Sequence, residues 1–271
     1  SEDIGERGNL LLKKEGSCVY SPVSNVETSD KFVSEYKYDF SECYGSNSTQ
    51  EDVYETCRPI VEAVMSGDNG TIFAYGQTGS GKTFSMEGEL GGKLEGVIPR
   101  TIGTIFQSIE EAVVDIEFSV QVSYIEIYLE RVRDLLSSDG MSQNLSIKED
   151  PATRAVYVEG AVCTYVTSPE EIFDALKEGA SNRATSATNM NEHSSRSHAV
   201  FLLTVQQKNC TTGTLKTGKL YLVDLAGSEK VRKTGATGSR LEEAKKINQS
   251  LSALGQVINK LTDGRSKHIP Y

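Results

Sequence analysis

The sequence predicts an α/β domain in which helices cover a central sheet, and three observations lead to this prediction. Short runs of β-forming residues alternate with helical patterns along the chain, an order typical of layered α/β folds. The 271 residues can bury one substantial core, and no repeat, linker or change of composition marks a domain boundary. Hydrophobic residues make up 37% of the chain and charged residues 24%, as in ordinary globular proteins. We therefore predict a single domain over residues 1–271.

Four segments have the pattern of strands. Residues 71–75 form a compact apolar run that ends at a glycine, and residues 120–128 alternate with a period of two. Two further apolar runs, residues 201–205 and residues 220–224, complete the set. The last of these ends on an aspartate, which matters for the chemistry considered below.

Three segments have the pattern of helices. Residues 49–65 precede a Gly-Asp-Asn-Gly turn and the first of these strands. A second helix starts at a Ser-Pro-Glu-Glu capping box at Ser168, and we expect Gly179 to end it. The clearest helix covers residues 244–261, where apolar residues recur at three- and four-residue steps. Such a stripe predicts a helix with one buried face.

Composition excludes several classes of protein. No uninterrupted apolar stretch approaches the roughly 18 residues of a membrane span, and the first residues lack the apolar core of a signal peptide. The five cysteines are scattered and form no Cys-x-x-Cys pair, and there are only three histidines. A disulfide framework, a structural zinc site and a histidine-rich metal site are therefore poorly supported. We expect a protein of a reducing compartment with no direct membrane attachment.

The charge is unevenly distributed along the chain. The net charge of −10 argues against nucleic-acid binding, which needs an electropositive surface. Residues 229–271 nevertheless carry nine Lys and Arg against four Asp and Glu, a net charge of +5, so the preceding residues carry −15. A basic end on an acidic body suggests a face for an acidic partner. A solvated loop and helix face would explain the same charges equally well.

A phosphate-binding loop follows the first predicted strand. Residues 76–83 match the pattern GxxxxGK[ST] at every fixed position, between a strand and an expected helix. Glycines let successive backbone N–H groups point at phosphate oxygens. Lys82 would reach the β- and γ-phosphates, and the Thr83 hydroxyl would bind Mg²⁺. The predicted nucleotide-binding residues of this loop are Gly76, Gln77, Thr78, Gly79, Ser80, Gly81, Lys82 and Thr83.

Two further polar segments accompany this loop. Asp224 ends an apolar strand, a position that suits a carboxylate holding metal-bound water, and Gly227 could place its N–H against a γ-phosphate. Residues 191–198, Asn-Glu-His-Ser-Ser-Arg-Ser-His, gather hydroxyl groups, a guanidinium and two imidazoles just before the strand at residues 201–205. For any one of these residues alone, a polar loop would be the simpler explanation.

Taken together, these segments resemble the kinesin motor family. The sequences GQTGSGKT, NEHSSRSH and DLAGSE stand in the family's order, and the resemblance covers essentially the whole chain. It is greatest for conventional, plus-end-directed transport kinesins, and it implies a P-loop NTPase fold with a central, mostly parallel mixed sheet and helices on both faces. Further segments that resemble family signatures are residues 96–100, 124–128, 251–255 and 268–271.

The resemblance implies a magnesium-dependent ATPase that microtubules stimulate. Thr83 and Ser195 would bind Mg²⁺ directly, and Asp224 would bind it through water. Phe84 follows the phosphate loop, where an aromatic ring would stack on adenine. The cofactors expected are therefore ATP and Mg²⁺.

For hydrolysis, the resemblance implies that Ser194 positions the attacking water. Arg196 and Glu229 would form an ion pair that closes two switch segments over the γ-phosphate. Glu229 would accept the proton through a second water, and Gly227 would contact the γ-phosphate. These roles agree with the needs of phosphoryl transfer, which are in-line positioning and charge neutralisation.

The family's partner is the microtubule, and its tubulin surface is acidic. In the family the helix expected at residues 244–261 and the loop before it contact tubulin, and this stretch coincides with the basic segment found above. The expected location is the cytoplasm and the microtubule cytoskeleton, and the full-length protein could pair as a coiled-coil dimer. The positions that match tubulin contacts are Lys230, Lys233, Lys245, Asn248 and, on another loop, Arg154.

Two departures from the family and two alternatives remain. The family's opening Arg-x-Arg-Pro strand and everything after His-Ile-Pro-Tyr have no counterpart here, so we expect a motor domain that is incomplete at both ends. A non-motile module that binds nucleotide and microtubules with weak or no turnover is one alternative. A GTPase is the other, because residues 259–262 superficially resemble the guanine-reading NKxD motif, although the fourth residue is Thr.

Overall fold

The computed structural model of the chain divides it into two compact units, Ser1–Val53 and Tyr54–Tyr271, and each is considered by itself. The first unit contains a four-stranded antiparallel sheet with the strands in the order β1-β2-β3-β4. Its strands are β1 (Glu2–Arg7), β2 (Leu10–Glu15), β3 (Cys18–Pro22) and β4 (Glu35–Asp39). The structure describes residues 2–7, 10–15, 18–22, 35–137, 144–185, 195–229, 239–264 and 268–270. The single domain expected over residues 1–271 stays a prediction.

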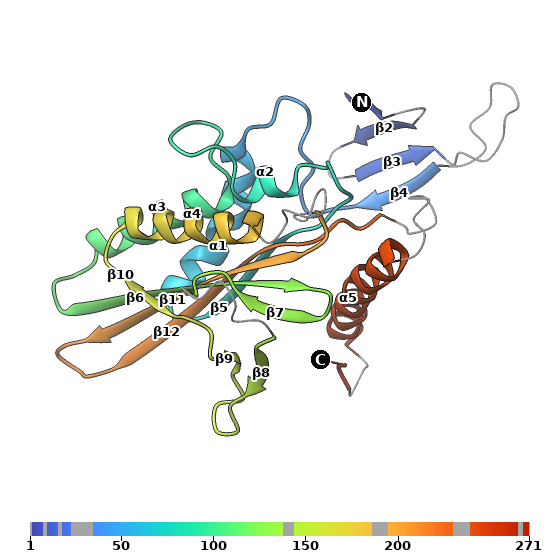
Figure 1. Cartoon of the computed structure of the whole chain (residues 1–271). Coiled ribbons are helices and arrows are strands. Elements are labelled where there is room, and N and C mark those ends of the chain that lie inside the picture. Colours follow the sequence, from blue (N-terminus) through green and yellow to red (C-terminus); the bar gives the residue numbers. More distant parts are fainter. Residues whose placement is uncertain are drawn as a thin grey trace, which may run out of the picture. The chain divides into compact units, whose positions relative to one another are not determined.

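The second unit is built on a six-stranded sheet in the order β10-β6-β11-β12-β5, with β7 also paired to β6 (Figure 1). All four predicted strands are present in it, and each is longer than predicted. The strands are β5 (Asn69–Ala74), β6 (Ile116–Tyr128), β7 (Arg131–Asp134), β10 (Thr164–Val166), β11 (His198–Asn209) and β12 (Leu215–Asp224). A separate hairpin pairs β8 (Ser146–Glu149) with β9 (Val156–Glu159).

The sheet is mixed, as expected, but the prediction that it is mostly parallel is wrong for the described strands. Only β12 and β5 pair in parallel, and the other pairs of this sheet are antiparallel. Short connections account for two of the four antiparallel pairs. β6 and β7 are joined by Leu129 and Glu130, both with positive φ, and β11 and β12 by residues 210–214. Connections of this length can only form antiparallel hairpins.

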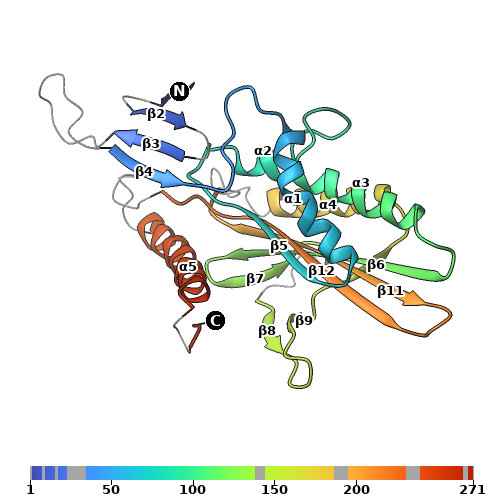
Figure 2. The ribbon, with the colours of Figure 1, turned by 180° about the vertical axis from the view of Figure 1, so that it is seen from behind.

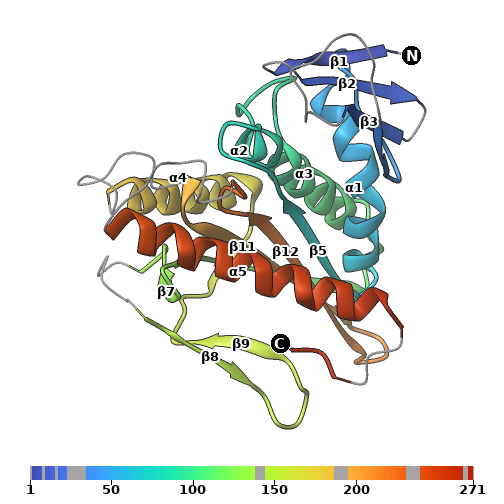
Figure 3. The same ribbon diagram turned by 90° about the vertical axis from the view of Figure 1, so that its right-hand side faces the viewer.

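Helices lie on both faces of this sheet (Figures 2 and 3). On one face, α4 packs on β6, and the α1 side chain Val64 packs against β5 and β12. On the opposite face, α5 contacts the first residue of β11. None of the described helices has the length and apolar character needed to cross a membrane. The helices are α1 (Gln50–Met65), α2 (Lys82–Met86), α3 (Val97–Glu110), α4 (Pro169–Thr185) and α5 (Ser239–Thr262).

The core lies between the sheet and the helices α1, α3 and α4. Alternate residues of β11 and β12 point into it, and the ring of Phe201 meets the ring of Tyr124 edge-on with 5.3 Å between centroids. These positions follow the period-two pattern of the sequence. The side chains with almost no exposed surface include Phe201, Leu203, Leu220, Leu222, Ile102 and Ile105. This packed layer fixes the strand ends that carry the site.

Gly179 does not end its helix, contrary to the sequence-based expectation. α4 continues to Thr185, and Gly179 lies inside it, directly over the ring of Tyr124 on β6. A Cβ atom added at Gly179 would overlap the Cδ1 and Cε1 atoms of that ring. The glycine is therefore needed for close approach of helix and sheet.

Replacing Gly179 with alanine should destabilise the fold by about 1–3 kcal/mol, because the new methyl group overpacks the core. Elsewhere in a helix the same change stabilises by about 1 kcal/mol. Gly103→Ala in α3 is the matched control, since its added Cβ meets no atom within 4 Å. The midpoints of urea unfolding should therefore shift in opposite directions, and two shifts of the same sign would contradict this account of Gly179.

Candidate nucleotide site

The loop between β5 and α2 has the backbone shape of a phosphate cradle. Gly79 and Gly81 have φ angles of +76° and +90°, which favour glycine. At Gly76 an added Cβ would lie 2.5 Å from Ser80 Oγ, so the chain can turn tightly there only without a side chain. The Lys82 ammonium group donates to the Gln77 carbonyl oxygen at 3.2 Å. The loop thus brings backbone N–H groups and one cation to the same place.

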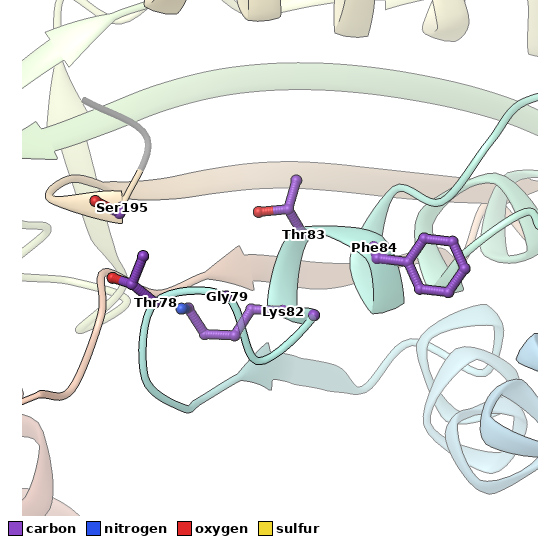
Figure 4. A pocket seen from close by; sticks show the side chains of 7 residues that line it. Thr78, Gly79, Lys82, Thr83, Phe84 and Ser195 are labelled. Atoms are coloured by element: carbon purple, nitrogen blue, oxygen red, sulfur yellow. The ribbon is translucent and has the colours of Figure 1, made fainter. Parts of the chain in front are cut away.

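A pocket of about 280 Å³ opens beside this loop (Figure 4). Lys82 folds back along the loop toward Thr78, and Ser195 approaches from the other side. The ring of Phe84 points away from Ser195 and is 48% exposed. The lining residues are Thr78, Gly79, Gly81, Lys82, Thr83, Phe84 and Ser195. The phosphate loop, the hydroxyl groups predicted to bind metal and the aromatic residue predicted to contact adenine therefore share one pocket.

Thr83 and Asp224 form a pair of oxygen donors at this pocket. The parallel register of β12 and β5 sets Asp224 opposite Ala74, next to the loop. The Thr83 hydroxyl donates to Asp224 Oδ2 at 2.6 Å, and the buried Asp224 Oδ1 has no hydrogen-bond partner in the described part of the chain. A buried carboxylate oxygen without a donor is costly. Hydroxyl and carboxylate oxygens are the ligands Mg²⁺ prefers, and Mg²⁺ keeps several waters, so the donor set fits a hydrated magnesium ion.

The segment after β12 is bonded to both neighbouring loops through its backbone. The N–H of Ser228 donates to the carbonyl of Gly76 at 3.1 Å, and the N–H of Gly227 donates to the carbonyl of Ser195 at 2.7 Å. A Cβ added at Gly227 would lie 2.5 Å from Thr78 Oγ1. The two predicted switch segments and the phosphate loop therefore meet at Gly227.

Glu229 holds the phosphate loop from the side of this segment. Its carboxylate accepts hydrogen bonds from the Thr78 N–H at 2.9 Å and from the Thr78 hydroxyl at 2.6 Å. Burial raises the pKa of Glu229, but these hydrogen bonds and the nearby Lys82 charge outweigh it, and the net pKa is lowered. Glu229 is thus an ionised acceptor, placed next to the pocket.

The predicted ion pair between Arg196 and Glu229 is not formed in this structure, and the pairing stays a prediction. Arg196 instead contacts Glu243 of α5 at 3.1 Å. The Tyr128 hydroxyl also donates to Glu243, at 2.9 Å, and burial together with this bond raises the pKa of Tyr128 to about 12. Each predicted partner is engaged elsewhere: Arg196 by a buried carboxylate and Glu229 by Thr78.

A buried charge cluster beneath the site was not predicted. Glu126, with 0% of its surface exposed, lies 3.5 Å from Arg183 Nε and 3.7 Å from Arg133 Nη1. Arg183 also lies 3.9 Å from Asp224 and donates to the hydroxyl and carbonyl of Ser197. The available signal was Glu126 itself, a charged residue on the buried side of an alternating strand. Its partner Arg183 lies 57 positions away, so sequence spacing could not reveal that pair.

The predicted tubulin contacts that the structure describes are on two elements. Lys245 on α5 is exposed and pairs with Glu242 at 2.6 Å, and Arg154 is exposed in the β8–β9 turn with a φ of +59°. Asn248 is half-buried and donates to the carbonyls of Ala244 and Glu229 at 2.9 and 3.4 Å. Ser194, Lys230 and Lys233 lie outside the described residues.

The fold and the pocket define this chain as a P-loop nucleotide-binding protein. A family model described as "Kinesin motor domain" matches residues 13–271. The chain therefore belongs to the kinesin motor domain family, a family of ATPase motors. This membership confirms the resemblance found in the sequence motifs.

Individual relatives agree with the family model. The chain is 51% identical over 272 residues to "Kinesin-related protein 3" of Dictyostelium discoideum, covering 98% of this chain and 22% of that protein. It is 54% identical over 237 residues to the "Kinesin heavy chain" of Syncephalastrum racemosum, covering 86% and 25%. A solved structure, "Structure of a fast kinesin: Implications for ATPase mechanism and interactions with microtubules", matches with a TM-score of 0.85 and 44% identity. That match covers all of this chain and 72% of the solved chain.

This similarity confirms the predicted α/β fold of the P-loop type. The chain nevertheless spans only about a quarter of the length of these two curated relatives. Activities and partners of such longer proteins are therefore taken up as proposals.

Proposed function

We propose that this chain is the catalytic part of a microtubule motor, which hydrolyses ATP in the pocket beside the phosphate loop with Mg²⁺ as cofactor. The observation that carries this proposal is the meeting of three segments at one pocket. Thr83 of the phosphate loop bonds to Asp224 at 2.6 Å, and Gly227 bonds to Ser195 at 2.7 Å. Sensing and hydrolysing a γ-phosphate requires such a junction of the phosphate loop with two switch segments.

Nucleotide binding would use the loop as it stands. The Lys82 ammonium group now donates to a single carbonyl of its own loop, and phosphate oxygens can replace that carbonyl as acceptors. Thr83 and Ser195 would hold the magnesium ion directly, with Asp224 holding it through water. When bound, the ion would neutralise phosphate charge. The ring of Phe84, which is 48% exposed and lines the pocket, would stack on the adenine base.

Hydrolysis would require the two switch segments to exchange partners. Arg196 would leave Glu243 and pair with Glu229, which would itself leave Thr78. This exchange would place Glu229 to accept a proton through a second water, while Ser194 positions the attacking water. Arg196 would give up its ion pair and Glu229 its two hydrogen bonds, so closure is a change of partners in which Glu243 keeps the hydrogen bond from the Tyr128 hydroxyl. The Gly227 N–H, now bonded to Ser195, would turn to the γ-phosphate.

We propose that microtubules bind the basic end of the chain, residues 229–271, and the β8–β9 turn that carries Arg154. Lys245 and Arg154 are exposed, as a contact with acidic tubulin requires. Lys230, Lys233 and Asn248 complete the proposed contact. We propose the cytoplasm and its microtubules as the location, and a coiled-coil dimer as the state of the longer protein. The second candidate is a non-motile module that binds nucleotide and microtubules with weak or no turnover. The sequence does not favour it, because the proposed catalytic side chains are all present.

Nucleotide binding can be tested directly. Lys82→Ala should weaken the affinity for a fluorescent ATP analogue at least about 100-fold in the presence of Mg²⁺, because the only cation lining the described pocket is lost. Lys93→Ala, on the loop beyond α2, is the matched control and should bind as the unchanged protein does. Equal binding by all three proteins would show that the nucleotide does not use this loop.

A further inference from the structure

One buried histidine joins two segments that the proposed mechanism treats separately. His198, the first residue of β11, is 7% exposed. Its Nδ1 accepts the backbone N–H of Ala226 at 3.0 Å, and its Nε2 lies 2.8 Å from Ser250 Oγ on α5. Ala226 lies between the proposed metal-binding residue Asp224 and Gly227. The imidazole ring therefore touches the γ-phosphate segment with one nitrogen and α5 with the other.

The hydrogen bonds fix the protonation of this ring. A backbone N–H can only donate, so Nδ1 must be an acceptor and the proton must be on Nε2. Nε2 then donates a hydrogen bond to Ser250 Oγ, and the Ser250 hydroxyl in turn donates one to the carbonyl oxygen of Ile247 at 2.7 Å. Burial, assisted by the charge of Arg183, lowers the pKa of His198 to about 4, which keeps the ring neutral near pH 7. Each hydrogen bond along this path therefore has one fixed donor and one fixed acceptor.

These hydrogen bonds limit how Ala226 can move. Ala226 cannot shift with its neighbours without moving the imidazole ring or losing the only bond that the described structure gives its N–H. The ring is anchored at the start of a strand that pairs on both sides, with β6 and with β12. The weaker attachment is therefore the one to α5, through a single serine.

We propose that His198 is a positioning residue that transmits movement of residues 225–229 to α5 through Ser250. This inference rests on the proposed function, in which that segment senses the γ-phosphate and α5 contacts the microtubule. It adds a specific connection between the two: one neutral imidazole with a fixed tautomer. His198 is not among the residues that line the described nucleotide pocket, so the role we assign to it is coupling and not catalysis.

Two substitutions separate the two halves of the connection. In His198→Asn the side-chain oxygen replaces Nδ1 and keeps the bond to Ala226, while the bond to Ser250 is lost. Ser250→Ala removes the same bond from the other side. Both should bind nucleotide and hydrolyse it without microtubules within about twofold of the unchanged protein, and both should lose about fivefold in microtubule stimulation. The double variant should lose no more than either single variant, because all three remove one contact.

Ser252→Ala is the matched control. Ser252 lies on the same helix and bonds to the Asn248 carbonyl at 2.6 Å, but it has no contact with His198. A second readout is independent of microtubules: hydrogen exchange of the α5 backbone with and without an ATP analogue. The unchanged protein and Ser252→Ala should show a nucleotide-dependent change in α5, and His198→Asn and Ser250→Ala should not.

Each other outcome overturns the inference. If His198→Asn and Ser250→Ala lower thermal stability and basal turnover but keep the full stimulation ratio, the histidine is only structural. Nucleotide binding that leaves α5 exchange unchanged in the unmodified protein overturns the coupling while the proposed function stands. An unmodified protein that binds no nucleotide overturns the proposed function, and the coupling with it.

Discussion

Replacing Glu229 with alanine should lower the turnover of ATP at least about 100-fold while nucleotide affinity stays within about threefold. A positioned proton acceptor contributes about 100- to 10,000-fold to a rate, and the Glu229 carboxylate is the ionised acceptor beside the pocket. It is also not among the groups that line the pocket. The variant should therefore hold ATP without hydrolysing it, which single-turnover hydrolysis and equilibrium binding would measure separately.

Glu229 also holds the phosphate loop through two hydrogen bonds from Thr78, and a control variant must separate this role from proton transfer. Thr78→Val removes the hydroxyl contact at 2.6 Å but leaves the carboxylate in the chain. If Glu229 is the proton acceptor, Thr78→Val should lose no more than about threefold in turnover. If both variants lose activity equally, Glu229 serves to hold the loop and the proposed proton acceptor is wrong. Full activity in Glu229→Ala would contradict the mechanism altogether.

The second large effect is expected on stability. Arg183→Met should lower the free energy of unfolding by about 3 kcal/mol, the lower end of the cost of breaking a buried ion pair. It removes the nearer of the two cations beside the fully buried Glu126, at 3.5 Å, and leaves Arg133 at 3.7 Å. The loss also deprives Asp224 and Ser197 of a cationic neighbour. Denaturant unfolding followed by circular dichroism measures the change.

Two further variants test the cause. Lys245→Met removes an exposed ion pair to Glu242 and should change stability by less than about 1 kcal/mol. Arg183→Met combined with Glu126→Gln should recover part of the loss, since the buried charge that Arg183 balances is then removed from β6. If the double variant loses more free energy of unfolding than the two single variants lose together, the cluster is not held by this charge pairing.

Much of the second unit was predictable because its signals are local. Residues 76–83 are contiguous, so one motif between a strand and a helix predicts the loop. Period-two and three-four patterns likewise identified the four strands and three helices. The mostly parallel sheet was a wrong expectation, because pairing direction depends on connection lengths and the patterns did not show where β7 and the β11–β12 turn begin.

Contacts between distant residues were not predictable. Glu243 binds both Arg196 and Tyr128, yet it lies 47 and 115 positions away from them. A glutamate on a helix face carries no signal that it is buried against a switch segment. Gly179 was misread for the same reason: local rules favour glycine at a helix end, whereas here the ring of Tyr124 on another element requires it. The roles of Ser194, Lys230 and Lys233 stay predictions.

The central claim is that this chain hydrolyses ATP and that microtubules accelerate it. The most direct measurement is steady-state ATP hydrolysis at graded microtubule concentrations, with co-sedimentation of the same samples. We expect saturable stimulation, with half-maximal stimulation at the concentration where half of the protein sediments. Microtubule binding without stimulation of hydrolysis would favour the non-motile module with weak or no turnover. The absence of both binding and hydrolysis in a chain shown to be folded would contradict the account.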